Sequence, residues 1–161
     1  MSLAPEVEKL LKDEGVDYEV IKHPTAYTAA EEAAVSHISG YEWAKTVIFF
    51  TESDEPIMAV LPASYHVNAD LLKDLVGSRK LRLAAESDFS GLYPNCEPGA
   101  MPPFGNLYGQ RVFVDARLAE DEQIVFNAGN HSEAVRLCYA DFERLAKPIV
   151  GSFGEGSGSG R

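Results

Sequence analysis

Apolar residues recur at helical spacing near the start of the chain. Val7, Leu10 and Leu11 stand at positions i, i+3 and i+4. Pro5 suits the first turn of a helix, because its missing N–H would have no intrahelical partner there. The pattern predicts a helix over residues 5–14.

Capping signals predict three further helices. Thr28 and Glu31 have the spacing of a capping box, which predicts a helix running to about residue 39. Asn68 is a favourable N-cap for a helix that ends near residue 76. Asp141 is the expected cap of a last short helix that ends near residue 147.

Short apolar runs between these helices predict β-strands. Residues 43–51 contain the continuous run Val-Ile-Phe-Phe, which is typical of a strand buried on both faces. A polar turn joins this run to the apolar residues 57–61, so the two strands are expected to pair as a hairpin. The other predicted strands cover residues 18–22, 81–83, 111–115, 123–127 and 134–139.

The order of these elements indicates the fold class. Strands outnumber helices and do not alternate strictly with them, which favours an α+β fold. We expect a mixed, largely antiparallel sheet curled into a barrel-like core with surrounding helices. The length of 161 residues fits a single domain over residues 1–150, and the Gly/Ser-rich residues 151–161 are expected to form a flexible tail.

Charge and composition restrict the function. A formal net charge of −11 argues against a broad electrostatic grip on nucleic acid. The local exception is a basic strip within residues 73–82, which either contacts one or two phosphates or is a solvated strand edge. The strip consists of Lys73, Arg79, Lys80 and Arg82.

Other features point to a cytoplasmic protein without membrane association. No apolar run approaches the roughly 20 residues needed to span a bilayer, and the N-terminus lacks the pattern of a secretory signal. Two cysteines do not make a disulfide framework. The histidines are isolated and no C-x-x-C or nucleotide-binding glycine motif occurs, so we expect no metal and no cofactor.

A segment dense in proline and glycine, residues 94–109, is the most unusual part of the chain. It holds four of the nine prolines and three glycines, yet it also carries Met101, Phe104, Leu107 and Tyr108. Such a segment is neither a regular helix nor a flexible linker. Long ordered loops inside compact domains are often functional, but this loop could also simply cover the core.

Two isolated residues are candidates for chemistry. Lys45 precedes the apolar run of residues 46–50, where it either binds an anion or is a strand-end lysine that reaches solvent. His131 stands in a turn between two predicted strands, where it is either solvated or shapes a pocket. Cys96 has an acidic neighbour, Glu97, which does not favour a reactive thiolate.

Several short motifs together resemble the YbaK/prolyl-tRNA-synthetase-associated editing domain family. The likeness extends over roughly residues 17–150, and its most specific feature is a lysine ahead of a buried strand combined with a downstream Gly-x-x-x-Pro. The motifs are Ile21-x-His23-Pro24, Ala44-Lys45-Thr46, Leu61-Pro62-Ala63, Gly99-Ala100-Met101-Pro102-Pro103 and Asn127-Ala128-Gly129.

The resemblance implies an activity and a site. Members of the family hydrolyse the ester of mischarged tRNA, mostly proline tRNA carrying alanine or cysteine, and need no cofactor. The resemblance implies that Lys45 is catalytic and that His131 is the pocket histidine of alanine-editing members. Further substrate-binding residues would be Gly99, Ala100, Met101, Pro102, Pro103, Thr46 and Tyr27.

The expected partner is the acceptor end of tRNA, with the basic strip in contact with phosphates and prolyl-tRNA synthetase as a second partner. We expect a trans-editing deacylase that acts on Ala-tRNA(Pro). The alternatives are a deacylase for Cys-tRNA(Pro) or another aminoacyl-tRNA, and a non-catalytic module that binds tRNA ends or a synthetase.

Overall fold

The computed structural model describes residues 3–24 and 42–156 of the chain. The first helix, α1 (Pro5–Asp13), begins at Pro5 as predicted and buries Val7 and Leu11. The predicted helix that starts at Thr28 lies outside the described residues.

The largest sheet has five strands in the order β5-β2-β3-β6-β9. β2 and β3 form the predicted antiparallel hairpin, in which Lys45 is opposite Leu61. β6 runs parallel to both of its neighbours. In sequence order the five strands are β2 (Ala44–Thr51), β3 (Pro56–Pro62), β5 (Leu81–Leu83), β6 (Arg111–Asp115) and β9 (Ile149–Gly151).

Two smaller sheets complete the β structure. One has the antiparallel order β1-β8-β7, from β1 (Tyr18–Lys22), β7 (Gln123–Asn127) and β8 (Glu133–Cys138). The other pairs β4 (Tyr65–Val67) with β10 (Gly154–Gly156).

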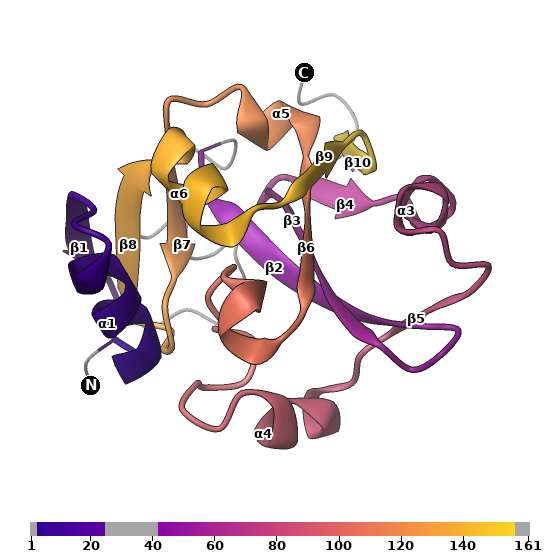
Figure 1. The fold of residues 1–161 in the computed structure, drawn as a ribbon, viewed down its shortest axis with the longest axis horizontal. Coiled ribbons are helices and arrows are strands. Elements are labelled where there is room, and N and C mark those ends of the chain that lie inside the picture. Colours follow the sequence, from indigo (N-terminus) through magenta and orange to yellow (C-terminus); the bar gives the residue numbers. More distant parts are fainter. Residues whose placement is uncertain (1–2, 25–41, 157–161) are drawn as a thin grey trace.

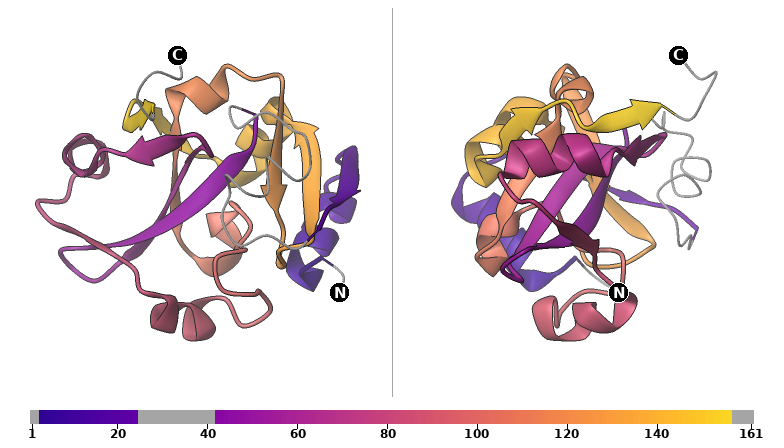
Figure 2. Two further views of the ribbon diagram at one scale, coloured as in Figure 1. Left: turned by 180° about the vertical axis from the view of Figure 1, so that it is seen from behind. Right: turned by 90° about the vertical axis from the view of Figure 1, so that its right-hand side faces the viewer.

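The described part of the chain contains no closed barrel, which corrects the predicted barrel-like core. The three-stranded sheet meets the five-stranded sheet at a single parallel bridge between Trp43 and Val125. Beyond that bridge β2 and β7 diverge, as Figures 1 and 2 show. The fold is therefore α+β with mixed sheets, as predicted, but the sheets stay separate.

The C-terminal residues also differ from the prediction, because the fold continues to residue 156. Phe153 is completely buried and lies between β9 and β10. Asp115 accepts hydrogen bonds from the backbone N–H groups of Phe153 (3.1 Å) and Gly154 (2.7 Å). One apolar anchor and one buried carboxylate thus hold a segment whose Gly/Ser content had predicted flexibility.

The remaining helices follow their capping signals with one exception. The Asn68 side chain accepts the N–H of Leu71 at 3.1 Å and opens α3 (Ala69–Val76). The last helix, α6 (Tyr139–Ala146), begins three residues earlier than predicted, so Asp141 lies inside its first turn. Short helical turns also occur at η1 (Glu86–Asp88), α4 (Phe89–Leu92), η2 (Gly105–Tyr108) and α5 (Ala116–Ala119).

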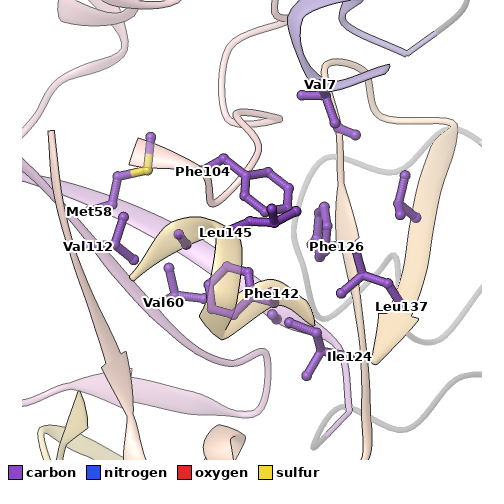
Figure 3. Packing of buried hydrophobic residues seen from close by; sticks show 14 of the residues in the cluster. Val7, Met58, Val60, Phe104, Val112, Ile124, Phe126, Leu137, Phe142 and Leu145 are labelled. Carbon is purple, nitrogen blue, oxygen red and sulfur yellow. The ribbon is translucent and has the colours of Figure 1, made fainter. Parts of the chain in front are cut away.

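The main core lies between the two larger sheets and the helices α1 and α6, and Figure 3 shows its centre. Phe104, from the Pro/Gly-rich segment, packs edge-on against Phe126 of β7 with a centroid distance of 5.4 Å. It also contacts Phe142 of α6 at 5.7 Å. The segment is therefore ordered, because a buried aromatic ring fixes it to two other elements.

Candidate active site

Two loops distant in sequence are hydrogen-bonded to each other at the end of β7. The N–H of Glu97 donates to the carbonyl of Gly129 at 2.7 Å, and the N–H of Gly129 donates to the carbonyl of Ala100 at 2.9 Å. Gly99 adopts a φ of 85°, a conformation that glycine takes without strain. We call residues 97–103 the proline loop and residues 128–131 the histidine loop.

His131 is the side chain that joins the two loops. It is only 4% exposed, and its backbone N–H donates to the carboxylate of Glu97 at 2.7 Å. Its ring Nε2 lies 2.7 Å from the carbonyl oxygen of Pro98. Because a carbonyl oxygen only accepts, Nε2 carries a proton in this arrangement.

The imidazole of His131 lies directly beside Gly99. A Cβ placed on Gly99 would stand 3.6 Å from the Cε1 atom of His131, which is van der Waals distance. The structure therefore brings two predicted site residues together. The other predicted residues of the proline loop are buried, and Ala100 and Met101 are 0% and 3% exposed. Met101 belongs to the main core, so its side chain anchors the loop.

Lys45 is the second residue of β2 and is partly buried. Burial lowers the pKa of its ammonium group, because desolvation disfavours the charged form. Its side chain makes no hydrogen bond or ion pair with any residue that the structure describes. Thr46, its neighbour, points to the opposite face of β2, because side chains alternate along a strand.

The strand pairing relates Lys45 to the histidine loop. Trp43 forms the parallel bridge to Val125, and both strands continue in the same direction from it. Lys45 lies two residues after Trp43, while β7 ends at Asn127 and leads into the histidine loop. Lys45 is thus on the strand that follows the bridge to β7.

Three of the four residues of the basic strip are already paired with carboxylates. The exception is Lys80, which is exposed and has no ion pair with a described residue. The Arg82 guanidinium also lies 4.4 Å from the centroid of the Phe50 ring. The pairs are Lys73 with Asp70 (3.0 Å), Arg79 with Glu52 (3.3 Å) and Arg82 with Asp88 (3.6 Å).

Cys96 is not an activated nucleophile. Its thiol is partly buried and lies 3.7 Å from the hydroxyl oxygen of Tyr108. Burial raises the pKa of the thiol, so the protonated form is favoured.

Other parts of the described chain offer less to chemistry. Residues 3–24 and 42–156 contain no group of three or more metal-ligating side chains. Pockets of about 330 and 420 Å³ occur beside Arg111 and beside Glu122 respectively, away from the two loops. The described helices include none that is long and apolar enough to cross a membrane. Tyr27, a predicted substrate-binding residue, lies outside the described residues.

Comparison with known proteins identifies the family. The model of the aminoacyl-tRNA editing domain matches residues 23–145. The chain belongs to this family. Its members are aminoacyl-tRNA deacylases, a class of hydrolases, and the matched range contains both loops and Lys45.

The sequence of this chain is similar to those of known editing proteins along nearly its whole length. The multifunctional Ser/Thr-tRNA deacylase ProXp-y of Escherichia coli K12 is 29% identical over 151 residues, which cover 89% of this chain and 88% of that protein. The same protein of strain O157:H7 matches equally.

Solved structures share the fold. The hypothetical protein APE2540 has a TM-score of 0.83 at 22% identity and covers 93% of this chain and 99% of its own. A candidate trans-editing enzyme for prolyl tRNA synthetase has a TM-score of 0.82 at 21% identity, with 96% and 100% covered.

Sequence reasoning missed one residue of this editing domain, Glu97. Its carboxylate accepts the N–H of His131, a residue 34 positions away. The sequence offered only an acidic residue next to a cysteine, and nothing local indicated the distant backbone group that it binds.

Proposed function

We propose that this chain hydrolyses the ester bond between a small amino acid and a mischarged tRNA, with Ala-tRNA(Pro) as the first candidate substrate. The observation that supports this most directly is the buried His131 ring, which donates to the Pro98 carbonyl and lies beside Gly99, at the end of the strand that is bridged to the segment carrying Lys45. In this proposal the imidazole, held by its hydrogen bond to Pro98, borders the amino-acid side chain and so favours a small one.

The chemistry needs few groups, because an aminoacyl ester is already activated. Water attacks the ester carbonyl carbon, negative charge develops on the carbonyl oxygen, and the C–O bond to the ribose breaks as the ribose oxygen takes a proton. Lys45 in its charged form stabilises the developing oxyanion. A neighbouring ribose hydroxyl of the substrate assists the water. This scheme needs no serine or cysteine nucleophile.

Serine and threonine esters are the second candidate substrates. The observation that favours them is the 29% identity to a protein named as a Ser/Thr-tRNA deacylase. The side chain of serine is larger than that of alanine by only one hydroxyl group. A pocket that excludes larger side chains by size alone therefore discriminates poorly between the two amino acids.

A deacylation panel tests the proposal. Proline tRNA charged with alanine, serine, threonine or cysteine is incubated with wild-type protein, with K45A and with K12A. Lys12 is an exposed lysine of α1 and serves as the matched control. We expect turnover by wild type and K12A, fastest with alanine, and loss of turnover in K45A.

Two results would contradict the proposal. Deacylation by K45A at the wild-type rate would remove Lys45 from the chemistry. Binding of the charged tRNAs without turnover by the wild-type protein would favour the alternative of a non-catalytic module.

For the tRNA contact we propose the basic strip, with Lys80 as its principal phosphate contact. Lys80 is the residue of the strip whose charge no described carboxylate neutralises. K80E should weaken tRNA binding and make the dependence of affinity on salt less steep. Unchanged binding would remove the strip from the interface. Added prolyl-tRNA synthetase should raise the deacylation rate if it delivers the tRNA.

A further inference from the structure

Asn127, the last residue of β7, has a buried side chain that the fold does not use. It is 8% exposed, and its Oδ1 atom is buried without a hydrogen-bond donor among the described residues. A buried acceptor without a donor costs free energy, so such groups are rare outside functional sites.

The Asn127 side chain does not shape the turn that follows β7. Asn130 shapes this turn instead, because its Oδ1 atom accepts the backbone N–H groups of Ser132 (2.9 Å) and Glu133 (2.8 Å). The backbone of Asn127 is paired with Ala134 of β8 in the regular ladder.

The position of Asn127 matches that of Lys45 on the neighbouring strand. Val125 and Asn127 share one face of β7, and Lys45 of β2 shares a face with Trp43, the residue directly before β2, because side chains alternate along extended strands. Trp43 and Val125 form the parallel bridge and belong to one buried cluster. Asn127 and Lys45 are therefore two residues beyond the bridge on the same side, where the strands diverge.

One of these two side chains offers an unused hydrogen-bond acceptor and the other offers unused donors. The Asn127 Oδ1 atom lacks a donor, and the Lys45 ammonium lacks an acceptor among the described residues. A ligand that presents a donor and an acceptor a few ångströms apart satisfies both. In an aminoacyl ester the α-ammonium group and the carbonyl oxygen are separated by two carbon atoms.

We propose that Asn127 binds the α-ammonium group of the aminoacyl ester through its Oδ1 atom while Lys45 contacts the carbonyl oxygen. This inference rests on the proposed deacylase function. It makes Asn127 a substrate-binding residue that selects a free amino group, and it predicts that esters of N-blocked amino acids are poor substrates.

The test crosses two substrates with the enzyme variants. The substrates are alanyl-tRNA and N-acetyl-alanyl-tRNA, which lacks the ammonium group. The variants are N127L, which has a similar volume and no acceptor, and N106A as a control at an exposed asparagine of η2. The measured quantity is kcat/KM for each pair, with circular dichroism as the check on folding.

For wild type and N106A, acetylation should lower kcat/KM about 10- to 100-fold, the range of one hydrogen bond to a charged group. N127L should lose a similar factor on alanyl-tRNA and nothing further on the acetylated substrate. A second variant, N127D, keeps an acceptor oxygen and should still discriminate against acetylation, even if N127L folds poorly.

Each contrary result has a separate meaning. An equal loss of kcat/KM on both substrates in N127L, or no loss on alanyl-tRNA, would overturn the role of Asn127 and leave the proposed function standing. N127D without discrimination would also overturn it. Wild-type protein that deacylates neither substrate would overturn the proposed function together with this inference.

Discussion

Removal of the Glu97 carboxylate should loosen the backbone of the histidine loop at His131. In the wild type this carboxylate accepts the N–H of the buried His131 at 2.7 Å, and the N–H of Glu97 donates to Gly129. E97A removes the first bond and keeps the second, so the proline loop stays in place. His131 then loses the acceptor of its backbone N–H and keeps the hydrogen bond from its ring to the Pro98 carbonyl.

The expected magnitude follows from the hydrogen bond that is lost. A hydrogen bond to a charged group contributes about 1.5–3 kcal/mol, and the His131 N–H would have no replacement acceptor in the same place. Glu97 is partly exposed, which lets water replace part of the bond and places the loss near the lower end of that range. E97Q keeps an acceptor oxygen and should lose about 1 kcal/mol or less.

Two measurements check the expectation. Urea unfolding gives the change in stability, and deacylation of alanyl- and seryl-tRNA gives the ratio of the two kcat/KM values. We expect E97A to lower the alanine-to-serine preference, because a loosened His131 no longer confines the side chain, and E97Q to stay near wild type. Unchanged stability together with an unchanged ratio in E97A would refute the tether.

Four further outcomes are expected. The pKa of Lys45 is lower in the folded protein than in the unfolded chain, so between these two pKa values the unfolded chain binds more protons. The free energy of unfolding should therefore rise with pH in that window. K45M should abolish this rise, which urea unfolding at a series of pH values measures. Enzymatic deacylation, corrected for spontaneous ester hydrolysis, should fall as Lys45 loses its proton. G99A should cost about 1–2 kcal/mol, measured by thermal unfolding, because alanine is strained at a φ of 85°; a neutral result would contradict that strain. D115A removes the acceptor of three backbone N–H groups, at Arg117, Phe153 and Gly154, and should lower stability by about 3 kcal/mol in urea, whereas D115N should lose less.

Local signals in the sequence predicted most of the individual elements. Asn68 opens α3, and the predicted strands at residues 111–115 and 123–127 match β6 and β7. These features depend on a few neighbouring residues, such as one cap or one apolar run. For that reason they can be found without knowledge of the rest of the fold.

Features set by distant contacts were not predictable in the same way. The parallel pairing of β6 with β9 joins segments about 36 residues apart, and no local pattern indicates it. The anchoring of residues 151–156 depends on Phe153 and Asp115, while the composition of that segment favours flexibility. The single aromatic residue among glycines and serines was the available signal.

The candidate site shows the same division. Lys45 and the Gly99 segment were predicted as site residues because each stands in a recognisable motif, and their roles stay predictions; the structure places the His131 ring beside Gly99. Glu97 was not predicted, because the group that it binds, the backbone N–H of His131, is distant in the sequence. Asn127 was visible only as part of a motif, although a polar residue directly after the apolar run Ile-Val-Phe in a buried strand is itself a signal.

The proposed roles assign the choice of substrate and the chemistry to residues of different sheets. Lys45 belongs to the five-stranded sheet, whereas His131 lies in the loop between β7 and β8 of the three-stranded sheet, and the two sheets meet at the Trp43–Val125 bridge. The proline and histidine loops are tied to each other by their own hydrogen bonds rather than to β2. A substitution in either loop can therefore alter the space for the amino-acid side chain without displacing Lys45. Under the proposed roles, the preferred amino acid can change while the hydrolytic chemistry stays the same.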